Sequence, residues 1–142
     1  MLDVSVGDQF QKHSYIFGIL VNADGKRFVD EGWDFHSFTY AKYGKVVLEQ
    51  PGQFAWQVFD SRVLGMLRDT YRIKQVTRVR ANTLEELAGK LEGVNRVQFL
   101  KTVAEYNAAV MTEVPYNPSV KDGRGTRGLA IPKSNWATEI SE

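Results

Sequence analysis

The chain has 142 residues, the size of one ordinary domain, and its 43% apolar and 25% charged content is typical of a folded globular protein. The 18 basic and 17 acidic residues are interspersed and leave a formal net charge of +1, which argues against a nucleic-acid partner. Because there is no cysteine, a disulfide framework, an iron–sulfur site and a cysteine nucleophile are excluded within this chain.

Location and metal binding follow from equally simple features. The longest apolar runs, such as residues 16–21, are too short to span a bilayer, and the first residues lack the regions of a secretory signal. We therefore expect a cytoplasmic protein. Its two histidines, His13 and His36, lack partners at the spacing of a zinc site, so no metal site is expected.

The first third of the chain predicts a hairpin and a helix. Residues 14–22 are β-branched and aromatic and predict a buried strand, and the Asp-Gly turn at residues 23–26 leads into a return strand at residues 27–30. Residues 31–38 show no period and predict a loop. Residues 39–49 have apolar side chains near helical spacing, before a Pro-Gly stop.

The middle of the chain predicts alternating strands and helices. Residues 54–60 predict a central strand, and Ser61 is positioned to cap a helix over residues 62–70. Residues 75–81 alternate in polarity and predict a short strand. Such alternation favours an α+β fold, a small β-sheet with packed helices.

Two further helices are predicted from their caps. Thr83 and Glu86 form a capping box before an apolar stripe, and Asn95 opens the next helix. The apolar face of that second helix is predicted to comprise Val97, Leu100, Val103, Ala104, Ala108 and Met111.

The last 28 residues differ from the rest. Residues 1–114 hold the predicted elements, whereas residues 115–142 are rich in Pro, Asn, Gly and Ser and form an irregular segment. This segment either packs on the domain or leads back to another part of the protein. Its Gly-x-Gly-x-x-Gly at residues 123–128 lies between prolines, so it predicts a glycine-rich loop and not a dinucleotide site.

No catalytic apparatus is evident from the residues alone. There is no nucleophile elbow and no Ser/His/Asp triad. Asp30, Glu31 and Asp34 are clustered, and clustered acids in a loop are usually solvated. The residues alone therefore indicate an α+β domain with a polar, aromatic loop after its first hairpin.

Four stretches nevertheless resemble one family, the flavoproteins of fumarate reductase and succinate dehydrogenase, in their capping domain. They are residues 18–31, with Gly-Lys-Arg-Phe-Val-Asp-Glu; residues 39–44 with 53–60; residues 81–88 with 102–107; and residues 117–123 with 132–137. The first and third are general to the family. The second and fourth look like its tricarballylate dehydrogenase branch.

The resemblance implies an FAD-dependent oxidoreductase. In such enzymes a Rossmann-type domain binds FAD, and the capping domain closes over the flavin and a small di- or tricarboxylate while a cap side chain moves the proton. This chain holds no FAD-binding domain. Residues 1–114 would be the capping core and residues 115–142 would return toward the FAD-binding domain of the same polypeptide. The isolated chain is expected to be inactive and to bind no FAD tightly.

The resemblance also implies site residues. Tyr40 aligns with the catalytic arginine of fumarate reductases and is predicted to be the acid/base. The alternatives are that another residue takes the role of this arginine, or that Tyr40 is a packed aromatic on a helix. The substrate-binding residues implied are Thr39, Lys42, Arg27 and Glu31, and those at the cofactor or domain interface are Lys133 and Asn135. Arg27 could equally be a surface charge of the hairpin.

The second hypothesis is an independent α+β module that binds a ligand or a protein without catalysis. The two hypotheses predict different surfaces. A capping domain should expose an apolar, aromatic patch near Tyr40, Tyr43 and Trp33, whereas an independent module should have a polar surface there and its tail tucked in.

Overall fold

In the part of the chain that the structure describes, one small sheet is combined with three α-helices, which confirms the α+β class predicted from the sequence. The computed structural model describes residues 13–66 and 79–141. In chain order the elements are η1 (His13–Phe17), β1 (Ile19–Val21), α2 (His36–Leu48), η2 (Pro51–Gln53), β2 (Trp56–Val58), η3 (Ser61–Met66), α3 (Leu84–Lys90) and α4 (Arg96–Ala109), where η denotes a 3-10 helix. Among the described residues no helix is long and apolar enough to cross a membrane.

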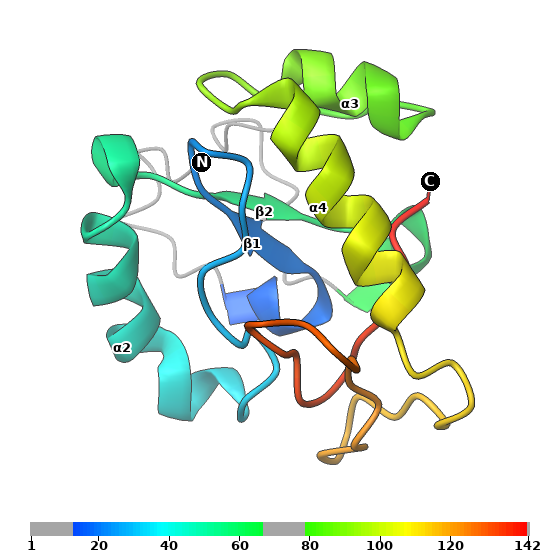
Figure 1. Cartoon of the computed structure of the whole chain (residues 1–142). Helices are drawn as coiled ribbons and strands as arrows, with labels where there is room; N and C mark the ends of the chain where they lie inside the picture. Colours follow the sequence, from blue (N-terminus) through cyan, green and yellow to red (C-terminus); the bar gives the residue numbers. More distant parts are fainter. Residues whose placement is uncertain (1–12, 67–78, 142) are drawn as a thin grey trace.

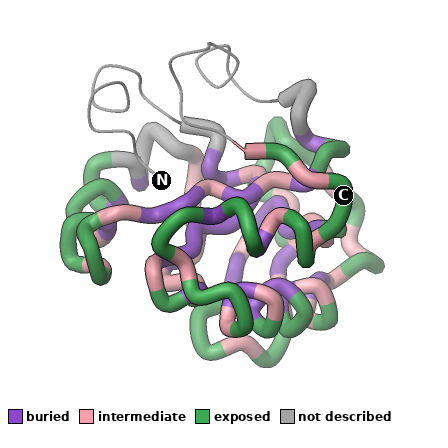
Figure 2. The backbone as a smooth tube through the Cα atoms, turned by 90° about the horizontal axis from the view of Figure 1, so that it is seen from above, coloured by how far each residue is buried: buried purple, intermediate pink, exposed green. Residues whose placement is uncertain are grey.

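The sheet lies between the helices. Strands β1 and β2 are antiparallel, with Ile19 opposite Val58 and Val21 opposite Trp56. Helix α2 flanks this sheet on one side, and α4, with α3 packed on it, covers the other (Figure 1). Buried segments run through the inside of the molecule, and exposed segments form its outer turns (Figure 2).

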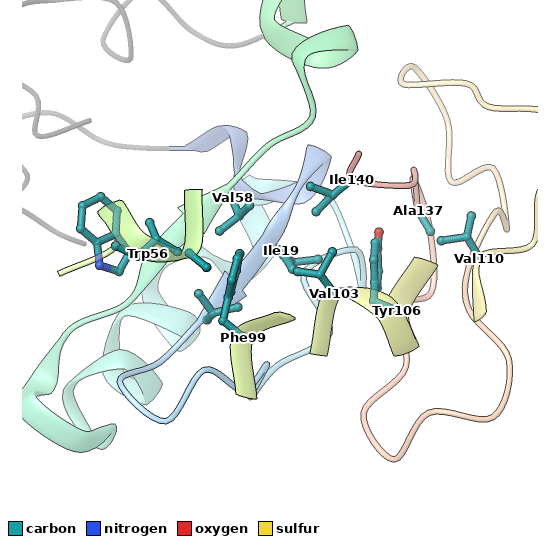
Figure 3. Packing of buried hydrophobic residues seen from close by; sticks show 12 residues of the cluster. Ile19, Trp56, Val58, Phe99, Val103, Tyr106, Val110, Ala137 and Ile140 are labelled. Carbon is teal, nitrogen blue, oxygen red and sulfur yellow. The ribbon is translucent and has the colours of Figure 1, made fainter. Parts of the chain in front are cut away.

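Two apolar cores form because side chains alternate along a strand. Ile19 and Val21 of β1 belong to the larger core with α3 and α4, whereas Leu20 between them belongs to a smaller core with η1 and α2. In Figure 3, Phe99, Val103 and Tyr106 of α4 lie against β1. The smaller core comprises Tyr15, Ile16, Leu20, Val29, Tyr43 and Trp136.

The turn after β1 docks the sheet on the start of α4. Gly25 has a φ of 78°, and a Cβ there would lie 2.6 Å from the backbone nitrogen of Phe99. Both conditions require glycine. The backbone N–H of Asn95 donates to the Ala23 carbonyl at 2.9 Å, so the predicted turn also fixes where α4 begins.

The two strands of the predicted hairpin are much shorter than predicted. Residues 13–17 form a 3-10 helix, so the strand is limited to Ile19–Val21, and the return strand is reduced to one bridge between Val21 and Arg27. The reason is tertiary: Arg27 turns inward to Glu31, and Val29 enters the smaller core, so the chain leaves the sheet. Within the predicted central strand, residues 54–60, a strand is confirmed at Trp56–Val58, but it is not central, because the sheet in the described residues has two strands.

Three other predicted elements differ in extent. Helix α2 begins at His36, three residues before the predicted start. The helix predicted after Ser61 is a 3-10 helix over Ser61–Met66, and its remaining residues lie outside the described part. Residues 79–81 form no strand, and residues 75–78 also lie outside the described part.

Both predicted caps are confirmed. The predicted face of α4 is right only in part, since Val103 is buried and Leu100 packs against the larger core. The backbone N–H of Glu86 donates to Thr83 Oγ1 at 3.1 Å, and that of Gln98 donates to Asn95 Oδ1 at 3.0 Å. On α4, however, Val97 is 78% exposed. The buried residues of α4 are Phe99, Thr102, Val103 and Tyr106. Two apolar stripes compete on this helix, and the one with the two large aromatics buries more surface.

Candidate functional site

The loop before α2 and the chain's tail lie side by side and form what we call the loop–tail junction, residues 30–35 with 131–136. The backbone N–H of Ser134 donates to Asp30 Oδ1 at 2.9 Å, and the Ser134 hydroxyl bonds to the other oxygen of this carboxylate. Asn135 Nδ2 donates to the Gly32 carbonyl at 2.9 Å. A Cβ on Gly32 would lie 2.2 Å from the Asn135 carbonyl oxygen, so only glycine permits this approach.

A buried ion pair lies beside the junction. Arg27 Nε donates to Glu31 Oε2 at 3.0 Å, and both side chains are nearly inaccessible, at 6% and 0% exposed. Glu31 Oε2 also accepts from the backbone N–H of Leu20 at 2.9 Å, and Arg27 Nη1 donates to the Ile131 carbonyl at 2.7 Å. Burial acts to lower the pKa of Arg27. The charge of the Glu31 carboxylate and its hydrogen bond to Arg27 act in the opposite direction, and the net result is a pKa above the ordinary value. The pair therefore ties β1 to the tail.

Lys133 is the second buried cation of this region. Its side chain is fully buried, and its Nζ donates to the Gly18 carbonyl at 2.7 Å. Burial lowers the pKa of Lys133 to about 8, against the opposing effect of the Glu31 carboxylate. The tail is thus attached to Gly18, directly before β1, as well as to the loop.

The first turns of α2 are held from several directions. The buried Thr39 hydroxyl bonds to the Tyr15 hydroxyl, and the Tyr43 hydroxyl donates to the Asp30 carbonyl. Burial, together with the Asp30 carboxylate, raises the pKa of Tyr43. Phe35, which precedes the helix, stacks in a tilted arrangement on Trp136 with ring centroids 5.2 Å apart. This end of α2 therefore contacts both η1 and the tail of the chain.

The predicted site residues lie in two places, the loop–tail junction and helix α2. The side chains of Arg27, Glu31, Lys133 and Asn135 gather at or beside the junction, and every polar contact named above is made inside the domain. Thr39 lies one turn into α2, and Lys42 is exposed on that helix. Tyr40 also lies on α2, and its side chain is outside the described part.

Two smaller expectations about charges are wrong. Arg27 is buried and is not a surface charge of the hairpin. Of the three clustered acids, Glu31 is fully buried and Asp30 accepts from Ser134, while Asp34 pairs with Lys121 at 3.1 Å. Asp30 is held by donors from Ser134 of the tail and Glu31 by its pair with Arg27, whereas Asp34 remains partly exposed.

The sequence analysis did not single out Tyr15 or Trp136. Both are buried aromatics of the smaller core, and Trp136 carries the ring contact to the start of α2. Tyr15 lies within the stretch predicted as a buried strand but belongs to η1, and Trp136 lies in the irregular tail. Only the position of Trp136 within an otherwise polar tail could have indicated an anchor.

The exposed aromatic patch is found only in part. Trp33 is 61% exposed as predicted, but Tyr43 is only 6% exposed and belongs to the smaller core. The tail is tucked in, since Trp136 and Ile140 are buried. The first observation agrees with a capping domain, and the other two agree with an independent module.

The described residues do not fit a dinucleotide cradle or a metal site. In residues 123–128 no helix begins, and Thr126 is paired with the tail through its N–H to the Lys133 carbonyl at 3.0 Å and its hydroxyl from the Lys133 N–H at 2.9 Å. The predicted glycine-rich loop is therefore confirmed. No group of three or more metal-ligating side chains occurs within residues 13–66 and 79–141.

The fold is that of a small α+β domain, and it is similar to part of a solved fumarate reductase flavocytochrome. No protein-family model matches the chain. It overlays a solved flavocytochrome c3 fumarate reductase, described as an open conformation, with a TM-score of 0.60 and 25% identity, covering 89% of this chain and 19% of the other.

The sequence relatives point the same way. The chain is 35% identical over 95 residues to the "Probable fumarate reductase Ifc3" of Shewanella frigidimarina, strain NCIMB 400, and 38% identical over 94 residues to the "Fumarate reductase (cytochrome)" of Shewanella frigidimarina. Each match covers 65% of this chain but only 15% of the relative. These findings show that the chain is similar to a part of fumarate reductases. They do not distinguish the tricarballylate dehydrogenase branch.

Proposed function

We propose that this chain is the substrate-capping domain of an FAD-dependent oxidoreductase that acts on a small di- or tricarboxylate, of the tricarballylate or fumarate/succinate type. The observation that carries this proposal is the overlay of 89% of the chain on part of a flavocytochrome c3 fumarate reductase. The isolated domain is inactive, because the redox group is held elsewhere in the same polypeptide.

Helix α2 supplies the reacting side chain in this proposal. Tyr40 lies directly after its first turn and serves as the acid/base, since a tyrosine hydroxyl can donate a hydrogen bond or transfer a proton. Thr39 and Lys42 flank it, and the exposed ammonium of Lys42 is free to approach a substrate carboxylate. The buried hydroxyl of Thr39 is already bonded to Tyr15, so its contribution is to hold this turn.

The residues at the junction act from behind the site. Arg27, Glu31, Lys133 and Asn135 would have to give up internal partners in order to touch substrate or cofactor directly. Losing such partners in a buried setting is costly, so we assign these four residues to holding the loop that leads into α2. The exposed Trp33 on this loop then faces the FAD-binding domain.

The described residues offer no cradle for FAD, so in this proposal the FAD-binding domain of the full protein holds it. The flavin supplies the redox chemistry. This chain binds the carboxylates, excludes water and holds the proton-transfer group in place.

The test is a chimera in which this chain replaces the matching domain of flavocytochrome c3 fumarate reductase. We expect its flavin to undergo a redox change on addition of tricarballylate, succinate or fumarate. Loss of a general acid/base lowers turnover by about 10²- to 10⁴-fold, so Tyr40→Phe should reduce the rate by at least about a hundredfold. Lys42→Ala should mainly raise KM.

The opposite outcome is equally clear. A folded, FAD-loaded chimera whose flavin responds to none of these carboxylates contradicts the capping role. Full activity of Tyr40→Phe contradicts the assignment of Tyr40 alone.

An independent binding module is the second candidate, because the tail is tucked in and Tyr43 is buried. It predicts that the isolated chain binds a small ligand or a protein by itself. Titration of the isolated chain with tricarballylate, followed by NMR, separates the two: saturable binding without any FAD-binding domain favours the module, and no binding favours the capping domain.

A further inference from the structure

We propose that Ser134 and Asn135 are positioning residues: they latch residues 30–35 to the tail and thereby set the first turn of α2, which carries Tyr40. The inference rests on the proposed function for its catalytic part. The latch itself rests on contacts within this chain.

Helix α2 needs such a latch because it has no cap of its own. Its N-cap residue is Phe35, which makes no side-chain hydrogen bond to the helix, and the first turn contains no acidic residue. The first N–H groups of a helix have no partner within it, so an uncapped helix end frays unless its surroundings fix it. Helices α3 and α4, by contrast, have caps from Thr83 and Asn95.

The latch holds the loop at two successive points. Ser134 binds the Asp30 carboxylate through both its N–H and its hydroxyl, and Asn135 Nδ2 binds the Gly32 carbonyl. Asn135 is itself fixed, because its Oδ1 accepts from the Gly123 N–H at 2.8 Å. In Figure 1 the orange-to-red tail passes beside the cyan loop that leads into α2.

The tail side of the latch is rigid because Trp136 anchors it. Trp136 is fully buried and has a φ of 56°, a left-handed conformation that is strained for a bulky residue. Its N–H donates to Asp122 Oδ1 at 2.9 Å, and its indole N–H donates to the Asn117 and Val120 carbonyls at 2.9 and 2.8 Å. Such strain persists only where the surroundings over-determine the backbone.

Asp30 carries the constraint from the tail to the helix. Its carboxylate is held by Ser134, while its backbone carbonyl accepts from the Tyr43 hydroxyl. Tyr43 lies three positions after Tyr40, so the two are one turn apart on α2. A shift of Asp30 therefore moves the turn between them. Misplacement of a reacting group by about 1 Å can lower a rate by about a hundredfold.

The first experiment measures the latch in the isolated chain by amide hydrogen exchange. In Ser134→Ala, the α2 amides should exchange about fivefold faster, the fold-change that corresponds to one lost hydrogen bond, while α4 stays unchanged. The matched control is Thr83→Ala, which should accelerate exchange at the start of α3 only. Unchanged exchange in α2 overturns the latch.

A second variant guards against a general loss of folding. Asn135→Asp keeps the acceptor for the Gly123 N–H but places an oxygen against the Gly32 carbonyl, so it opens only one contact of the latch. It should likewise accelerate exchange in α2. Acceleration spread evenly over α2, α3 and α4 in both variants indicates a merely structural role and overturns the proposal.

The second experiment uses the FAD-loaded chimera. Ser134→Ala should lower kcat about tenfold with KM within about twofold, because proton transfer depends on placement more than carboxylate binding does. Ser134→Thr restores the hydroxyl and should restore kcat. An unchanged kcat, with accelerated exchange in α2, overturns the positioning role. A folded, FAD-loaded chimera whose flavin responds to none of the carboxylates instead overturns the proposed function and leaves the exchange result to decide the latch.

Discussion

Helices α3 and α4 differ from α2 in what fixes their start. Thr83 and Asn95 cap the first two with their own side chains, within three residues of the amides that they bind. Helix α2 begins at His36, and its N-cap residue, Phe35, provides no side-chain cap. The loop that leads into α2 is held by residues about 100 positions away. The start of a helix can therefore be determined locally, by its own cap, or by a distant segment that packs against the loop before the helix.

This contrast has a mechanical consequence. A locally capped helix keeps its start even when distant contacts loosen, whereas α2 depends on the tail remaining docked. The proposed reacting residue, Tyr40, lies on the dependent helix. The following substitutions, made in the isolated chain, separate the two kinds of helix.

The largest expected effect is at the anchor of the tail. Trp136→Ala removes a fully buried indole that contacts Phe35 and should lower the free energy of unfolding by about 3–5 kcal/mol, measured by denaturant titration. Trp33→Ala, at a 61% exposed position, is the control and should change it by less than about 0.5 kcal/mol. Equal effects of the two would contradict the anchoring role of Trp136.

Breaking the buried ion pair should have the next largest effect. Glu31→Gln leaves the Arg27 guanidinium buried without a countercharge and should destabilise the chain by about 3 kcal/mol. Asp34→Asn breaks the more exposed pair with Lys121 and should leave the melting temperature nearly unchanged. A comparable loss in both variants would mean that burial does not distinguish these two pairs.

Lys133 should make stability depend on pH. Its folded pKa of about 8 lies below the ordinary 10.5, so between these values the unfolded chain binds more protons and stability rises with pH. The free energy of unfolding of the wild-type chain, minus that of Lys133→Met, should rise by about 2 kcal/mol from pH 8 to 10. Taking the difference removes the contribution of the tyrosines. A flat difference would show that Lys133 titrates normally when folded.

The smallest expected effect is at a local cap. Thr83→Ala should cost about 1 kcal/mol by removing the acceptor for the Glu86 N–H. The exposed Thr112→Ala is the matched control and should cost less than about 0.5 kcal/mol. Circular dichroism during denaturation measures both. If Thr83→Ala destabilised the chain as much as Trp136→Ala, the distinction between local and distant control would fail.

By itself the sequence determined the features whose signals lie within a few residues. The capping box at Thr83, the cap at Asn95, the turn at Gly25 and the core segment around Trp56 all follow from local hydrogen bonding or from backbone freedom. The family likeness also came from short contiguous stretches. Each of these features can be predicted without knowing which residues pack against it.

Only the tertiary structure decided the remainder. It selected Phe99 and Tyr106 over Val97 as the buried face of α4, moved the start of α2 to His36, and turned Arg27, Glu31 and Lys133 inward. The physical reason is that burial of a charged group depends on whether a countercharge or hydrogen-bond donors compensate for the lost water. For Glu31 the partner is Arg27 nearby, but for Asp30 it is Ser134, whose distance of 104 positions along the chain leaves no local trace.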